Sequence, residues 1–322
     1  MTRARFSRFA CSVLAANLAV ILWGAYVRAS GSGAGCGSHW PLCNGEVLPR
    51  SPAMATIVEL THRLTSGIAL LLVARLVVAA RRSLPRGDRA RAAAAWSAFF
   101  ILTEALLGAG LVLLEHVADD KSIARGWWVG AHLVNTYLLV AALALTAWWS
   151  SPGAPAAGLV RDEGSVGMGA RSGARAAARL AVIASLLGML LLGVSGAITA
   201  LGDTLFPVAT IEEGKALTFS PSAHAFVRLR VWHPVIAIAV GALVAWAAFN
   251  VIATRPSTLV RRVAIAAVAV VAGQMLLGVA NVWWLAPIPL QIAHLLLADL
   301  AWIALVALAG STLVGERSPG TA

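Results

Sequence analysis

The chain has 322 residues, of which 59% are hydrophobic and only 12% are charged, and its mean hydropathy is +0.82. These values exclude an ordinary soluble domain. The formal net charge of +11 is typical of nucleic-acid-binding proteins, but the basic residues gather in short segments between long apolar stretches. We therefore interpret the charge as a membrane-topology signal and expect lipid contacts and no nucleic-acid partner.

Eight apolar segments are long enough to cross a bilayer, which needs roughly 20 residues each. Their continuous apolar character favours helices, because barrel strands would alternate every second residue. The first segment lacks a small-residue cleavage site, so we interpret it as a retained helix. In chain order the predicted helices cover residues 9–27, 57–80, 92–114, 126–149, 180–201, 231–252, 263–285 and 288–314. The sequence thus predicts an all-α integral membrane protein.

Arginine clusters precede the first helix and fill the second, fourth and sixth connections, whereas the odd-numbered connections are poorer in basic residues. This positive-inside bias predicts that both termini are cytoplasmic. The absence of an amphipathic transit segment, with the Ala/Arg-rich composition, favours a bacterial plasma membrane.

Residues 151–178 are rich in Gly, Ala, Ser and Arg and show no hydrophobic periodicity. We interpret this stretch as a flexible cytoplasmic linker. It would separate an N-terminal four-helix bundle, residues 1–150, from a C-terminal one, residues 179–322.

The second half of the chain repeats motifs of the first. Gly24-Ala25 precedes His62 at nearly the same spacing as Gly196-Ala197 precedes His233. Leu-Leu-Gly and Ala-His-Leu also recur, the latter around His132 and His294. The repeats predict two pseudo-equivalent bundles, each with two histidines at the non-cytoplasmic ends of its helices.

These four histidines are the strongest candidate ligands. A single histidine in a membrane helix often only bonds a neighbouring helix, worth about 0.6 kcal/mol. Four at matching depth favour function, because ionisable groups are costly in lipid. Zinc or copper would normally need three or four close protein ligands. Two per half suit the two axial faces of a heme iron.

The halves differ beside their first histidine. Glu59 stands three residues before His62, and Arg230 stands three before His233. A carboxylate near the iron can move protons, and a guanidinium can bind a heme propionate. The alternatives are that Glu59 pairs with Arg63 or Arg28, and that Arg230 extends toward the interface.

The first external loop holds Cys36 and Cys43. Their spacing allows a disulfide outside the cytoplasm. A structural staple and a redox role remain equally open. Cys11, inside the first helix, is interpreted as a packing residue.

Taken in order, these motifs resemble the heme A synthase family over nearly the whole chain. The matching features are Gly24-Ala-Tyr-Val-Arg28, Gly31-Ser-Gly-Ala-Gly-Cys36, Trp40-Pro41-x-Cys43, Glu59-x-x-His62-Arg63, His132, Gly196-Ala-Ile-Thr-Ala-Leu-Gly-Asp203, His233-Pro234, Gln274-x-Leu-Leu-Gly278 and His294.

The resemblance implies an oxidoreductase that converts the C8 methyl group of heme O to the formyl group of heme A for terminal oxidases. The N-terminal half would hold the substrate heme O through His62 and His132, with Glu59 as the catalytic carboxylate. The C-terminal half would bind heme B as cofactor through His233 and His294. A heme O synthase would deliver the substrate; the sequence identifies no electron acceptor, and a homo-oligomer is compatible with it.

The sequence departs from the family pattern in two places. Residues 202–226 lack the second cysteine pair that many bacterial members carry, which weakens a thiol relay in both halves. Glu104 stands where the second half has Gln274, and we expect it to be structural. Asp299, deeper in the last helix, is equally compatible with a helix-bridging or a functional role.

Two other functions remain open. A quinol-oxidising di-heme protein of the cytochrome b kind would place histidine pairs in both leaflets, whereas these four lie at one side. A non-catalytic heme-handling protein would leave the Glu59/Arg230 asymmetry without a purpose.

Overall fold

The computed structural model describes residues 1–151, 168–255 and 257–312. In these residues it is entirely helical apart from turns and one isolated bridge between Cys43 and Glu46. Eight helical segments have the length and apolar composition to cross a membrane, which confirms the predicted all-α, multi-pass architecture.

The first four long helices are α1 (Arg3–Ala29), α2 (Met54–Ser83), α3 (Arg89–Leu113) and α4 (Ile123–Ser150). Each packs on the next, and α4 closes the ring against α1. The helices α2 and α4 therefore lie diagonally across this bundle.

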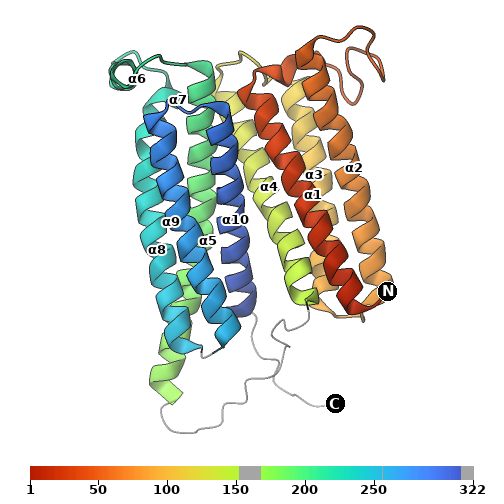
Figure 1. Ribbon diagram of the computed structural model, residues 1–322, viewed down its shortest axis with the longest axis vertical. Coiled ribbons are helices and arrows are strands. Elements are labelled where there is room, and N and C mark those ends of the chain that lie inside the picture. Colours follow the sequence, from red (N-terminus) through yellow and green to blue (C-terminus); the bar gives the residue numbers. More distant parts are fainter. Residues whose placement is uncertain (152–167, 256, 313–322) are drawn as a thin grey trace.

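The second bundle has the same order. It consists of α5 (Met168–Leu205), α8 (Trp232–Thr254), α9 (Thr258–Trp283) and α10 (Ile288–Thr312), and α10 closes the ring against α5. The diagonal pair is here α8 and α10. Shorter helices lie at one end of the bundles: η1 (Ser32–Ala34), α6 (Ile211–Thr218), α7 (Ala225–Arg228) and η2 (Leu229–Val231) (Figure 1).

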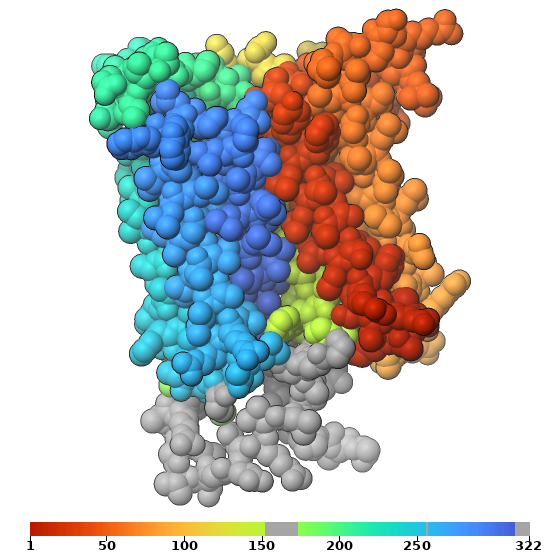
Figure 2. Space-filling view, in the orientation of Figure 1, coloured from red at the N-terminus to blue at the C-terminus, as the bar shows by residue number. Residues whose placement is uncertain are grey.

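The two bundles meet through α1 and α4 on one side and α5 and α10 on the other (Figures 1 and 2). Tyr137 of α4 stacks on Trp302 of α10 with ring centroids 5.0 Å apart, and Trp302 Nε1 donates to the Tyr137 carbonyl at 2.7 Å. One buried hydrophobic cluster includes residues of α4, α5, α8, α9 and α10. The halves thus share a core across this seam.

At the end of the molecule that carries the N-terminus, Asp88 explains how α3 begins. Its Oδ1 accepts from the Ala90 amide at 2.9 Å, which caps the helix, and its Oδ2 accepts from Arg3 at 2.8 Å. Arg3 also donates to the Trp149 carbonyl at 2.6 Å. These bonds tie the start of α1 to the start of α3 and the end of α4.

The predicted linker is too long at its C-terminal end. Helix α5 already begins at Met168, inside the stretch assigned to the linker. From residue 174 on, the physical reason is that Ala174-Arg-Ala-Ala-Ala178 consists of strong helix formers, which extend an adjoining apolar helix without any periodic pattern of their own. Helix propensity does not explain the first turns, which contain Gly169 and Gly173. Residues 152–167, and the predicted end of the last helix at residue 314, lie outside the described residues.

Candidate heme-binding sites

Each half places its first histidine against a glycine of the first long helix of its bundle. A Cβ added to Gly24 of α1 would lie 2.8 Å from His62 Cε1, and one added to Gly196 of α5 would lie 2.9 Å from His233 Cε1. A Cβ atom essentially never approaches a non-bonded heavy atom this closely, so only glycine lets these imidazoles lie so close to the helix backbone. The repeated Gly-Ala motif therefore has the same packing role in both bundles.

The second histidine of each half meets a polar side chain of the helix before it. His132 Nδ1 on α4 lies 3.1 Å from Glu104 Oε1 on α3. On α9, Gln274 Nε2 donates to His294 Nε2 of α10 at 3.2 Å. Glu104 and Gln274 both precede a Leu-Leu-Gly motif, so residues at matching sequence positions contact matching histidines.

Hydrogen bonds favour the imidazole tautomer that binds iron. Ser195 Oγ lies 2.8 Å from the Leu192 carbonyl oxygen and 2.9 Å from His233 Nδ1. When the hydroxyl donates its one proton to the carbonyl, it accepts from His233 Nδ1. This leaves the lone pair on His233 Nε2. His294 Nε2 accepts from Gln274, so it too is unprotonated, and this amide must turn aside when a ligand binds.

The histidines form one pair in each bundle, because the helices that carry them are diagonal. His62 lies on α2 and His132 on α4, and in the other bundle His233 lies on α8 and His294 on α10. The buried Nδ1 atoms of His62, His132 and His294 have no hydrogen-bond partner among the described residues, although His132 Nδ1 lies within ion-pairing distance of Glu104. Two imidazoles on opposite helices suit the two faces of a planar macrocycle.

A bare metal ion fits this arrangement poorly. The described part of the chain contains no group of three or more His, Cys, Asp or Glu side chains that could hold an ion. Structural zinc sites need four such ligands. The residues present fit a heme, which brings four equatorial nitrogens of its own and needs protein ligands only at its axial positions.

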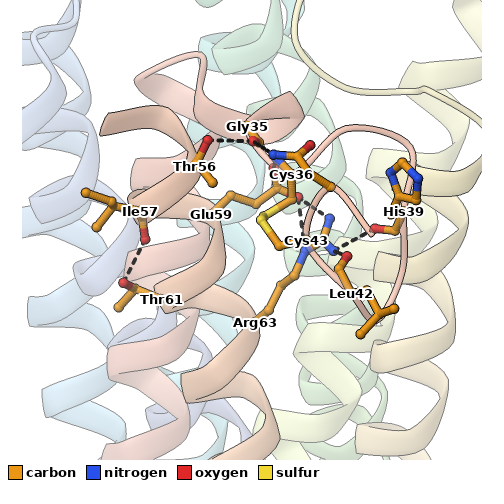
Figure 3. The surroundings of a disulfide bond; sticks show 11 residues. Gly35, Cys36, His39, Leu42, Cys43, Thr56, Ile57, Glu59, Thr61 and Arg63 are labelled. Atoms are coloured by element: carbon orange, nitrogen blue, oxygen red, sulfur yellow. Dashed lines mark hydrogen bonds and ion pairs between the residues drawn. A yellow bond between two sulfur atoms is a disulfide. The ribbon is translucent and has the colours of Figure 1, made fainter. Parts of the chain in front are cut away.

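Glu59 is buried, and it is bonded both to the loop between α1 and α2 and to Arg63 of its own helix (Figure 3). Its Oε2 accepts from the Cys36 amide at 2.8 Å, and its Oε1 accepts from Arg63 Nε and Nη2 at 3.1 and 2.5 Å. Arg63 Nη1 donates to the carbonyls of His39 and Leu42, each at 2.6 Å. The pairing with Arg63, and not the one with Arg28, is therefore present, and the pair clamps the loop onto α2.

Cys36 and Cys43 of this loop form a disulfide, and both side chains are completely buried. The Asn44 amide donates to the Cys36 carbonyl at 2.9 Å, which closes the loop beside the bond. The disulfide that the spacing allows is therefore formed, and both a structural and a redox role of the pair stay predictions. Cys11, expected to be a packing residue, is exposed on the surface of α1, as a lipid-facing residue would be.

Gly35 sets how closely the loop approaches α2. A Cβ there would lie 2.4 Å from the backbone C and O atoms of Ala55. We expect Gly35→Ala to destabilise the protein by about 1–3 kcal/mol, because backbone must move. Thermal unfolding in detergent measures this. Gly33→Ala is the control, since its Cβ would meet Val117 Cβ at an ordinary 3.6 Å; equal unfolding midpoints for the two variants would contradict the expectation.

Arg230 faces inward but already has a protein partner. Its Nε lies 2.9 Å from Asp203 Oδ1, and its Nη2 donates to the Phe206 carbonyl at 3.1 Å. It therefore does not extend into solvent. Binding of a propionate by this guanidinium stays a prediction, and it would compete with Asp203.

Three features were not foreseen. Arg28 of α1 crosses the seam, with Nη1 donating to the Ala200 carbonyl at 2.8 Å and Nη2 to Gln291 Oε1 at 3.2 Å. Ser195 supports His233, and Glu104 contacts His132. For the last two contacts the sequence held a signal: Ser195 adjoins the repeated Gly-Ala motif, and Glu104 stands at the position that matches Gln274.

Comparison with known proteins gives two kinds of match. The family model described as "Cytochrome oxidase assembly protein" (COX15-CtaA) matches residues 7–306. Two proteins from different strains of Thermus thermophilus, both named "Protoheme IX farnesyltransferase", are 48% identical over 309 residues. The matches cover 96% of this chain and 48% of each relative, so the chain spans about half their length. A "Heme A synthase" of Bacillus mycoides is 45% identical over 96 residues, which are 30% of this chain and 31% of that protein.

Proposed function

Because the chain belongs to the cytochrome oxidase assembly protein family COX15-CtaA, we propose that it is a heme A synthase, which oxidises the C8 methyl group of heme O to a formyl group. The observation that carries the proposal is the arrangement of two histidine pairs, each on diagonal helices of its own bundle. The match to a protein named heme A synthase supports the same activity.

In this proposal the N-terminal bundle holds the substrate. His62 and His132 bind the heme O iron from opposite sides, and the glycine at position 24 lets His62 approach. Oxidation of a methyl group releases protons, and a buried carboxylate can accept them. Glu59 Oε2 is the proposed acceptor, because it is bonded only to the Cys36 amide, whereas Oε1 is held by Arg63.

In the same proposal the C-terminal bundle would hold heme B through His233 and His294. When bound, this heme supplies a one-electron redox centre near the substrate half. Ser195 keeps the Nε2 lone pair of His233 available, and Arg230 is proposed to bind a propionate. The terminal electron acceptor is a separate molecule.

The Thermus relatives suggest the supplier of the substrate. Their name describes farnesylation of protoheme IX, and they are about twice as long as this chain. We infer that a farnesyltransferase acting on protoheme IX provides the farnesylated heme that this chain consumes, as a separate partner or on the same polypeptide.

Pigment analysis tests the function directly. Cells that make heme O are grown with and without this chain, and their hemes are extracted and separated by chromatography. The proposal expects the formyl-bearing heme A only when the chain is present. Heme O recovered unaltered by purified protein under every redox condition would refute it and favour a heme-handling role.

Glu59→Gln separates chemistry from heme binding. We expect heme A formation to fall at least about a hundredfold, the size typical of losing general acid–base catalysis, while heme B remains bound. Chromatography of extracted pigment measures the product, and the absorbance of the purified protein measures heme B. Glu46→Gln, in the exposed part of the same loop, is the matched control and should stay active. Full activity of Glu59→Gln would reject its catalytic role.

A further inference from the structure

Glu104 is the one carboxylate within hydrogen-bonding distance of any of the four histidine rings in the part of the chain that the structure describes. Its Oε1 lies 3.1 Å from His132 Nδ1 and also accepts from Thr136 Oγ1. Its Oε2 accepts from Asn135 Nδ2 at 2.6 Å. Three groups of α4 thus converge on one side chain of α3.

The carboxylate is held in a fixed position. Asn135, which is buried, also donates to the Phe100 carbonyl at 2.9 Å and accepts from Thr103 Oγ1 at 2.6 Å. Both of these partners belong to α3, so the amide bridges the two helices. Because Asn135 and Thr136 both donate to it, Glu104 acts as an acceptor and places its negative charge 3.1 Å from His132 Nδ1, although these two atoms do not meet hydrogen-bond geometry.

A carboxylate close to the Nδ1 edge of a ligating histidine makes that histidine a stronger ligand than a neutral neighbour would, because the negative charge raises the basicity of Nε2. Greater ligand basicity stabilises ferric over ferrous iron and lowers the reduction potential. The effect depends on the charge of the acceptor and not on helix packing.

We propose that Glu104 is a positioning residue that makes His132 the strongest donor among the four histidines, and so biases the heme of the N-terminal half toward the ferric state. The inference rests on the proposed function, because it takes His132 as an axial ligand. It assigns Glu104 a role in tuning the substrate site, in addition to joining α3 to α4.

The C-terminal half has no such group at the matching place. Gln274, a neutral amide, contacts His294, and a serine hydroxyl supports His233. The two hemes should therefore differ in potential even though each has two imidazole ligands. This difference would leave the substrate iron oxidised under conditions in which the cofactor iron is reduced.

Redox titration of the purified, heme-loaded protein tests the inference. Glu104→Gln keeps the shape and puts the same side chain at position 104 as at 274. We expect the ferrous-to-ferric ratio of the N-terminal heme at a fixed potential to rise about tenfold, which is 59 mV for a one-electron couple. The electron paramagnetic resonance signal of that ferric heme should also shift, and Glu104→Asp should restore much of both.

Ser195→Ala is the matched control, because it removes a support of His233 and should change only the heme of the C-terminal half. An unchanged potential and resonance signal in Glu104→Gln, with heme content intact, would overturn the inference. Loss of the N-terminal heme in Glu104→Gln that Glu104→Asp reverses would support it, whereas loss in both variants would overturn it. If the unmodified chain binds no heme in that half, the proposed function itself is refuted.

Discussion

Replacing His233 with alanine is expected to remove the heme B of the C-terminal half from the purified protein and to halve its total content when both sites are loaded. The remaining ligand, His294, would bind the iron from one face only. The loss is large because iron–imidazole bonds hold the heme, and α8 contains no other histidine, cysteine or methionine that could replace the lost ligand. The pyridine hemochrome spectrum measures the heme per chain.

His39→Ala is the control for this variant, because His39 is an exposed side chain of the first external loop. It should retain the full heme content. A further comparison is His132→Ala, which should remove the substrate heme and leave heme B in place. Unchanged heme content in His233→Ala would refute the assignment of the C-terminal site.

Replacing Arg63 with methionine is expected to lower the free energy of unfolding by about 3–5 kcal/mol, the usual effect of removing one partner of a buried ion pair. The side chains of Arg63 and Glu59 are only 11% and 5% exposed. The substitution leaves the carboxylate of Glu59 with one donor, and it leaves the carbonyls of His39 and Leu42 without their arginine. Denaturation in detergent, followed by circular dichroism, measures the loss.

The double variant Glu59→Gln/Arg63→Met completes a thermodynamic cycle. It should be less destabilised than the sum of the two single variants, because no unpaired charge remains buried. Arg50→Met, an exposed arginine just before α2, is the control and should change stability by no more than about 0.5 kcal/mol. Additive effects of the two single changes would show that the pair does not act as a unit.

The helices were predictable because their signal is strong: continuous apolar segments bounded by arginines predict spans whatever their neighbours are. The start of α5 was not, because Ala and Arg continue a helix without a pattern that distinguishes them from a linker. For the same reason composition alone could not place residue 168 inside a helix.

The histidines were predictable as candidates from their recurrence, but their environments were not. Glu59 was expected to lie beside the iron or to pair with Arg63 or Arg28. The structure shows the pairing with Arg63 and adds a bond from the Cys36 amide, since the loop between α1 and α2 folds back onto α2. Sequence spacing places residues on one helical face, but it does not state which neighbouring element meets that face. The contact of Glu104 with His132 depends on how α3 and α4 pack, which no local pattern in the chain encodes.

Arg28 restricts which bundles can associate. Ala200 follows Gly196 at the same spacing as Arg28 follows Gly24, and the guanidinium of Arg28 bonds the carbonyl of that very alanine. A homodimer of two N-terminal bundles would bring two guanidinium groups face to face at this point, where their mutual repulsion would be strong. The bonds of Arg28 to Ala200 and Gln291 thus favour association of the N-terminal bundle with the C-terminal one.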